Sequence, residues 1–289
     1  MKTLQIEIKN KTNLTLQLEK KYTVSYSEKN NSFIKLFLKK DKNLDIYFHQ
    51  GSITKEAKEF AKNAKLVIVN SKTTKNSFLD VDHNKIEIIE PYFIPKIDYD
   101  KIIKKQFKAE YHISKNTRII FFRGKDLLKS GIHTVFDILS RMYEESFVLV
   151  IESTSKEIIQ LRKQMEKVQI KYRYILFEDK KEIEQLFIAA DIFLLPTTTE
   201  YFSLDILKAF YYKTAVFVME NNAASEIVDV FSYIQGPEDR SVSFKIDSLL
   251  LNPIELKNIQ KANQKKSKEF TLEKSLEKIS NLIDKSFDN

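Results

Sequence analysis

The stretch that decides the fold runs from Ala190 to Asp229 and reads ADIFLLPTTTEYFSLDILKAFYYKTAVFVMENNAASEIVD. An apolar run at Ile192–Leu195 ends in a polar loop, which leads into a helix that opens at Phe202-Ser203-Leu204. A second apolar run, Ala215–Met219, follows this helix, and a further helix is predicted to begin near Ala224. Strand, helix and strand in this order indicate a parallel α/β unit. Because the first N–H groups of a helix lack partners within the helix, the loop–helix junction predicts an anion-binding site.

The same alternation of strand-like and helix-like segments extends over the rest of the chain. Apolar runs suited to strands of a parallel sheet lie at Thr3–Ile8, Tyr22–Tyr26, Asp45–His49, Leu66–Asn70, Ile86–Ile89, Arg118–Phe122, Phe147–Ile151 and Tyr174–Phe177. Amphipathic patterns predict helices near residues 32–40, 53–64, 73–79, 131–143, 156–168 and 181–190, and a helical stretch over 253–287. The predicted fold class is therefore α/β. The prolines at 91 and 95 interrupt this pattern, and two prolines so close together favour an extended connection between two domains.

Composition narrows the function classes. The chain of 289 residues has no cysteine, which excludes disulfides and thiolate chemistry, and its four histidines show no metal-ligand spacing. The net charge of +8 predicts an anionic partner, but the base composition of an AT-rich genome explains a lysine-rich sequence equally well. No apolar run is long enough for a membrane span, and the first residues lack the apolar region of a signal peptide, so we expect a cytoplasmic protein.

The stretch from Ala190 to Asp229 resembles the nucleotide-sugar site of retaining GT-B glycosyltransferases of family 4, with their pattern aD-hhhhPS…E-x-F-G-hhhhEAh…G-xPVhhhd…E. The resemblance implies two Rossmann-like parallel-sheet domains that face a cleft. Residues 1–95 would form an abbreviated acceptor-side domain, residues 96–270 the nucleotide-sugar-binding domain, and 271–289 a terminal helix that packs back toward the N-terminal domain. The implied activity is sugar transfer, with retention, from a nucleotide diphosphate sugar to a cell-surface glycan or lipid-linked acceptor, without a metal cofactor. A catalytically degenerate GT-B subunit that binds a partner or glycan is the alternative.

The resemblance also implies roles for residues of this loop and helix. Glu200 would accept hydrogen bonds from hydroxyls of the transferred sugar, although a solvated loop glutamate also suits this position. The helix start at Phe202, Ser203 and Leu204 would hold the diphosphate, with Ser203 in place of the family's glycine, or Ser203 would act only as a helix cap. Lys208 stands where the family has its ribose-binding glutamate. A lysine cannot accept a hydrogen bond, so that contact is lost or rebuilt, with Asp205 as one candidate replacement.

Two further places resemble family sites. The segment from Phe121 to Gly131 is similar to the phosphate clamp hhhGR…KG, with candidate residues Arg123, Gly124, Lys125 and Lys129. Cations at a strand end would neutralise the diphosphate leaving group, whereas the alternative is a charged surface loop. His49 ends a predicted strand, where the family often has a histidine near the acceptor, but a lone histidine can equally be structural.

One short segment suggests a membrane contact. Residues Ser32–Lys40 read SFIKLFLKK, an apolar and basic pattern that is suited to peripheral docking on the anionic inner face of a membrane. The alternative is a crossover helix buried against the sheet. Nucleic-acid binding is not expected, because the lysines are dispersed and no recognition motif is present.

Overall fold

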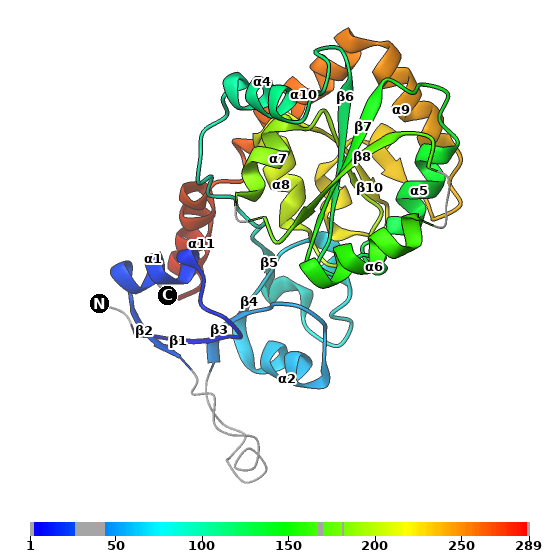
Figure 1. Ribbon diagram of the computed structural model, residues 1–289. Coiled ribbons are helices and arrows are strands. Elements are labelled where there is room, and N and C mark those ends of the chain that lie inside the picture. The colour runs from blue at the N-terminus through cyan, green and yellow to red at the C-terminus, as the bar shows by residue number, and fades with distance from the viewer. Residues whose placement is uncertain (1–2, 27–43, 167–169, 181, 288–289) are drawn as a thin grey trace. The chain divides into compact units, whose positions relative to one another are not determined.

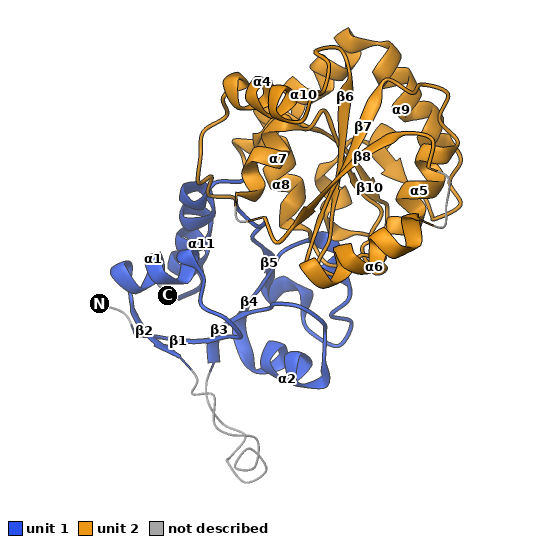
Figure 2. Cartoon of the chain, in the orientation of Figure 1, with its two compact units in different colours: residues 1–92, 270–289 blue, residues 93–269 orange. Residues whose placement is uncertain are grey.

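The computed structural model describes residues 3–26, 44–166, 170–180 and 182–287 (Figure 1). The chain divides into two compact units, which are coloured separately in Figure 2. Unit 1 comprises residues 1–92 and 270–289, and unit 2 comprises residues 93–269. The segment Ser32–Lys40, with its predicted helix and membrane contact, lies outside the described residues. Within the described ranges, no helix is both long and apolar enough to cross a membrane.

Unit 1 is built on a five-stranded parallel sheet in the order β2-β1-β3-β4-β5. Its strands are β1 (Thr3–Ile8), β2 (Thr23–Tyr26), β3 (Leu44–Phe48), β4 (Ala64–Val69) and β5 (Ile86–Ile88). Its helices are α1 (Asn13–Lys21), α2 (Lys55–Asn63), α3 (Lys72–Asn76), a 3-10 turn (His83–Lys85) and α11 (Leu272–Phe287). Successive side chains of β3 enter different cores: Ile46 and Phe48 pack with α1 and α11, whereas Tyr47 packs with α2. This alternation is the two-residue period of a strand with helices on both faces.

Helix α11 supplies part of the core of unit 1. Ile279 and Ile283 are fully buried in one cluster with Leu4 of β1 and Leu18 of α1. The hydroxyl of Tyr22 donates to Oδ1 of Asp284 at 2.9 Å. The last described helix therefore completes the unit that the first strand begins.

Unit 2 contains a six-stranded parallel sheet in the order β11-β10-β9-β6-β7-β8. Its strands are β6 (Arg118–Arg123), β7 (Phe147–Ser153), β8 (Arg173–Glu178), β9 (Ile192–Leu195), β10 (Ala215–Met219) and β11 (Tyr233–Ile234). Its helices are α4 (Lys101–Glu110), α5 (Ile132–Ser140), α6 (Ser155–Met165), α7 (Ile183–Ala189), α8 (Leu204–Tyr211), α9 (Ser241–Leu251) and α10 (Pro253–Ser267). Every residue of β7, β9 and β10 is buried, as expected for inner strands covered by helices on both faces.

The structure differs from the sequence-based prediction in two of the predicted helical segments, and the helices α1, α4 and α9 were not predicted. The helix predicted near Ala224 is only a 3-10 helix, Ala223–Ile227, because Val228 has extended backbone (φ −103°, ψ 152°). A second 3-10 helix, Val230–Ser232, follows directly. The helical stretch predicted over 253–287 is two helices, α10 and α11, and these belong to different units.

The order of strands in unit 2 fixes where a ligand can bind. From β6 the chain moves to β7 and β8 on one side, whereas β9, β10 and β11 follow on the other side. The winding of the sheet therefore reverses between β6 and β9. Doubly wound sheets bind ligands at the carboxyl ends of the strands at such a switch point. The loops that follow β6 and β9 are therefore the expected place of the site.

Candidate functional site

The loops after β6 and β9 contact each other directly. The backbone N–H of Thr198 donates to the carbonyl of Lys129 at 3.3 Å, and the hydroxyl of Thr197 donates to the same carbonyl at 3.2 Å. Gly131, at the start of α5, has φ +90°, and a Cβ atom there would lie 2.0 Å from the carbonyl oxygen of Pro196. Only glycine fits both this backbone and this contact. The predicted clamp segment and the predicted anion site are thus brought together at the switch point.

The clamp loop itself is tightly folded around a second glycine. A Cβ atom on Gly124 would lie 2.0 Å from Oγ of Ser130, so the loop closes on itself there. The N–H of Gly124 donates to the carbonyl of Glu152 at 3.2 Å, which ties the loop to the end of β7. Lys125 and Lys129 are both exposed, and Lys129 Nζ lies 3.1 Å from a carboxylate oxygen of Asp126. Both amines are therefore accessible to a ligand.

Arg123, by contrast, is held by two carboxylates. Its Nε donates to Glu152 at 2.9 Å and its Nη1 donates to Asp205, in the first turn of α8, at 2.7 Å. Lys208 Nζ donates to the other oxygen of Asp205 at 2.8 Å. These four side chains are only 8–22% exposed and their formal charges cancel. We call them the Asp205 network, and the arrangement makes Arg123 a structural cation of the site.

Asp205 stays ionised despite its burial. Burial alone would raise the pKa of its carboxyl group, but the nearby charges of Arg123 and Lys208 outweigh this effect and lower the pKa below its usual value. Burial likewise disfavours the charged guanidinium of Arg123, and Asp205 and Glu152 more than compensate and raise its pKa. The ammonium group of Lys208 is thus paired inside the network.

The start of α8 is open for an anion. Ser203 is the N-cap residue, and its hydroxyl makes no capping bond to any residue that the structure describes. Phe202 is buried, whereas Leu204 is 49% exposed. The N–H groups of the first helical turn carry partial positive charge. The hydroxyl of Ser203 therefore lies beside these N–H groups without a capping bond.

The loop that carries Glu200 is fixed from the next strand. Asn222, only 1% exposed, donates from Nδ2 to the carbonyls of Thr199 at 2.8 Å and Tyr201 at 2.7 Å. The carbonyl of Glu200 accepts from the N–H of Ala223 at 2.9 Å, and its side chain is exposed. Sequence reasoning missed Asn222. The available signal was a polar residue just after a buried strand, at the edge where the sheet binds ligands.

His49 lies in unit 1, after β3, and is 7% exposed. Its Nε2 lies 2.8 Å from the carbonyl of Gly51, and its Nδ1 lies 3.0 Å from the hydroxyl of Tyr47. A carbonyl can only accept, so Nε2 carries the proton and Nδ1 accepts from the tyrosine. The ring packs edge-on against Phe78, and burial lowers the pKa of His49. The imidazole is therefore neutral, and both of its nitrogens have partners within unit 1.

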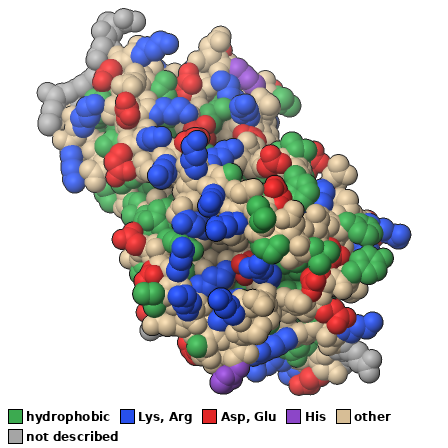
Figure 3. All heavy atoms as spheres, turned by 90° about the horizontal axis from the view of Figure 1, so that it is seen from above, with side chains coloured by type: hydrophobic (Ala, Val, Ile, Leu, Met, Phe, Trp, Pro, Cys, Tyr) green, Lys and Arg blue, Asp and Glu red, His purple; other side chains and the backbone are tan. Residues whose placement is uncertain are grey.

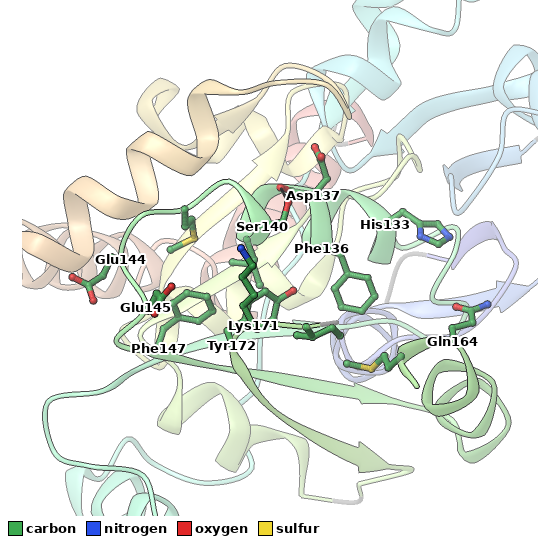
Figure 4. Close-up of a pocket in the computed structure, with 14 residues that line it drawn as sticks. His133, Phe136, Asp137, Ser140, Glu144, Glu145, Phe147, Gln164, Lys171 and Tyr172 are labelled. Atoms are coloured by element: carbon green, nitrogen blue, oxygen red, sulfur yellow. Dashed lines mark hydrogen bonds between the residues drawn. The ribbon is translucent and has the colours of Figure 1, made fainter. Parts of the chain in front are cut away.

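A cavity of about 460 Å³ lies elsewhere in unit 2. Figure 4 shows Phe136, Phe147 and Tyr172 among the residues that line it. Phe147 is the first residue of β7, and Tyr172 immediately precedes β8. The cavity is thus at the amino ends of these strands, at the opposite edge of the sheet from the clamp loop and the start of α8.

The family model described as glycosyl transferases group 1 matches residues 103–266, which is more than half of the chain. The chain belongs to this family. The match contains the clamp loop, the Asp205 network and α8. The predicted family and enzyme class are thereby confirmed: the protein is a glycosyltransferase.

Solved structures of glycosyltransferases share the fold over nearly the whole chain. HepE from Anabaena, in complex with UDP, has a TM-score of 0.77 at 14% identity and covers 99% of this chain and 100% of its own. WaaG, a glycosyltransferase involved in lipopolysaccharide biosynthesis, has a TM-score of 0.67 at 12% identity, over 97% of this chain and 99% of its own. Sucrose-phosphate synthase from Thermosynechococcus elongatus has a TM-score of 0.70 at 14% identity, over 99% of this chain and 74% of its own. Among curated proteins, none matches the sequence significantly. The predicted GT-B fold, with two Rossmann-like parallel-sheet domains, is confirmed.

Proposed function

We propose that this group 1 glycosyltransferase binds a nucleotide diphosphate sugar at the carboxyl ends of β6 and β9, and transfers the sugar with retention to a cell-surface glycan or lipid-linked acceptor. The observation that carries the proposal is the hydrogen-bonded contact between the clamp loop and the loop that leads into α8. Structures of HepE in complex with UDP and with UDP-glucose support a nucleotide diphosphate sugar as the donor class.

The start of α8 and the clamp loop would hold the diphosphate. In the transfer, the bond between the sugar carbon and the phosphate oxygen breaks, and negative charge builds up on the departing diphosphate. The N–H groups and hydroxyl at Ser203, together with the exposed amines of Lys125 and Lys129, would stabilise that charge. Because these groups supply positive charge, we propose that the reaction needs no divalent metal.

Glu200 and His49 keep their proposed roles on the sugar and on the acceptor side. The exposed carboxylate of Glu200, on a loop held by Asn222, is suited to accept hydrogen bonds from sugar hydroxyls. His49 is a neutral imidazole whose nitrogens contact Tyr47 and Gly51, so it would have to exchange one of these partners for an acceptor hydroxyl.

We infer that Asp205 does not take over the family's ribose contact. Both of its oxygens are bonded within the network, one to Arg123 and one to Lys208. The donor would therefore be bound mainly through its diphosphate and sugar. We expect nucleoside diphosphate affinity to depend strongly on the clamp lysines and to exceed that of the matching nucleoside by a wide margin.

Calorimetric titration with UDP, GDP and ADP, followed by a panel of nucleotide sugars with mass detection of the product, tests this function. Replacing both clamp lysines (Lys125→Ala with Lys129→Ala) should weaken nucleoside diphosphate binding at least tenfold, because a charge-assisted phosphate contact is worth roughly 1.5–3 kcal/mol. The matched control replaces the exposed lysines Lys156 and Lys163 by alanine and should bind as the parent does. Glu200→Ala should lose transfer, whereas Glu238→Ala, another exposed glutamate, should not.

The degenerate-subunit alternative is favoured by one observation, the ion-paired lysine at position 208. Under that alternative, neither the parent nor a Lys208→Glu variant binds any nucleoside diphosphate. If the enzyme is active, Lys208→Glu should bind UDP, GDP or ADP at least as tightly as the parent. Full transfer activity in Glu200→Ala would remove that residue from the site without removing the function.

A further inference from the structure

A row of lysines runs along the outer face of α10. Lys257, Lys261 and Lys265 are spaced four residues apart, so they share one face of the helix, and all three are exposed. Ile254, one turn earlier on the same face, is 74% exposed. In Figure 1, α10 and α4 lie at the top, and Figure 3, seen from above, shows Lys and Arg side chains gathered in a band.

Helix α4 extends this surface. Lys104 on α4 pairs with the carboxylate of Asp191 at 2.8 Å, and Gln260 on α10 donates to the carbonyl of the same aspartate at 3.0 Å. Both helices are therefore anchored at Asp191, directly before β9. The exposed face of α4 adds Lys101 and Lys105, with the 55% exposed Ile102 between them. Together the two helices carry eight lysines against two glutamates.

Five of these lysines serve neither the fold nor the donor site. Within the part of the chain that the structure describes, no ion pair is formed by Lys101, Lys105, Lys257, Lys261 or Lys265. The surface adjoins the amino ends of β6 and β9, whereas the clamp loop and α8 start lie at the carboxyl ends. An unpaired positive surface of this kind is complementary to a partner with many negative charges.

We propose that the face formed by the exposed lysines of α4 and α10, with Ile102 and Ile254, docks on an anionic lipid bilayer. Lysines attract the headgroups, and aliphatic side chains among them can enter the boundary between headgroups and acyl chains. Single-stranded nucleic acid is bound instead through aromatic side chains on which bases stack, and the exposed large side chains of these two helices are aliphatic. The proposal goes beyond the transfer reaction and does not depend on it.

Co-sedimentation of the full chain with vesicles tests the proposal. The parent should bind phosphatidylcholine vesicles that contain phosphatidylglycerol, should not bind pure phosphatidylcholine, and should be released by high salt. The triple variant Lys257→Glu, Lys261→Glu, Lys265→Glu should lose binding roughly tenfold or more, because each lysine near the surface contributes to attraction. A matched triple charge reversal at the exposed lysines 55, 156 and 163 should bind vesicles as the parent does. If vesicle binding depended only on the overall excess of lysine, both triple variants would lose it to the same extent.

A second pair of variants separates a bilayer from other polyanions. Ile254→Ser should weaken vesicle binding but leave binding to a DNA duplex unchanged, and Leu79→Ser, which alters an 80% exposed leucine of unit 1, should change neither. The proposal is overturned if both triple variants lose vesicle binding equally. It is also overturned if the duplex binds more tightly than the vesicles and Ile254→Ser has no effect on vesicle binding.

Discussion

Asp205 balances the charges of two cations at the start of α8. Its carboxylate joins Arg123 at the end of β6 to Lys208 one turn along its own helix. Glu152, at the end of β7, completes the network from the other side. A lysine at position 208 is therefore tolerated because its charge is matched locally, and the exposed cations of the site are those of the clamp loop.

Asp205→Asn should destabilise the protein by about 3 kcal/mol near neutral pH, because two mostly buried cations would keep a single carboxylate partner. The folded-state pKa of Asp205 is lowered, so its contribution is present above the unfolded pKa and is lost as the pH falls through the folded pKa. The difference between parent and variant should therefore shrink on acidification. Urea unfolding at a series of pH values measures it. Asp126→Asn, which weakens an exposed pair with Lys129, should cost much less than Asp205→Asn because solvent screens that pair, and equal losses for both variants would contradict this reading.

For individual residues, the sequence identified the cations of the clamp but not the carboxylates that pair with Arg123. Arg123, Gly124, Lys125 and Lys129 lie in one loop, so a local pattern found them. Arg123 is separated from Glu152 by 29 residues and from Asp205 by 82 residues, and only the strand order brings these side chains together. A local pattern therefore could not show that Arg123 is already neutralised by two distant carboxylates.

Among the elements, α8 has a second attachment at its other end. Tyr212, its C-cap residue, donates to the carbonyl of Ile97 at 2.8 Å and to the carboxylate of Glu184 on α7. That carboxylate also accepts the N–H groups of Lys96 at 2.9 Å and Ile97 at 3.2 Å. The helix whose start would bind the donor is thus fixed at its end to the first residues of unit 2.

Tyr212→Phe should lower the free energy of unfolding of unit 2 by about 1–3 kcal/mol, because it removes the hydroxyl donor from the Ile97 carbonyl and one of the three donors to the buried Glu184 carboxylate. Burial raises the pKa of the Tyr212 hydroxyl, so the group stays protonated, and the loss should be the same from neutral to mildly alkaline pH. Chemical denaturation provides the measurement. Tyr211→Phe removes a bond to the exposed Asp98 and should cost less than about 1 kcal/mol. A larger loss in Tyr211→Phe than in Tyr212→Phe would refute the assignment.

The hydrophobic pattern predicted the secondary structure correctly where the positions of the apolar residues match the positions that are buried in the fold. The strand predicted at Arg118–Phe122 corresponds to β6, which extends one residue further. The prediction succeeded because the inner side chains of this strand are buried on both faces, as its uninterrupted apolar pattern indicates. The helix α1 was missed, although Thr12 and Thr15 form a capping box at its start. Its polar sequence has only a weak apolar periodicity. Its buried side chains, Leu14, Thr15 and Leu18, could not be recognised without the sheet and α11 against which the helix packs.

For the whole molecule, the chain passes from unit 1 to unit 2 near residue 92 and returns near residue 270. Ile279→Ala should destabilise unit 1 by about 2–5 kcal/mol, since it removes a fully buried side chain from a core shared with β1 and α1. Hydrogen exchange should speed up in the strands of unit 1, while the strands of unit 2 keep their protection. Lys285→Ala, on the exposed side of the same helix, is the control. Equal acceleration in both units would show that they unfold as one.

The fold class and family could be predicted from the sequence because the stretch from Ala190 to Asp229 contains a strand, a loop, a helix and a second strand in close succession. Unit 1 offered much weaker signals. His49 shows the limit: its position after a strand was predicted, but its burial and its bonds to Tyr47 and Gly51 depend on side chains whose positions only the folded chain fixes.

The return of the chain to unit 1 also sets an order of biosynthesis. Because α11 follows unit 2 in the sequence, it leaves the ribosome after all of unit 2 has been made. Unit 2 can fold during translation, whereas the early strands of unit 1 must wait with one apolar face uncovered until α11 arrives. During that interval the nascent chain exposes Leu4, Ile6 and Ile46. Chaperone capture of this glycosyltransferase should therefore act on its amino-terminal strands and end when α11 has emerged.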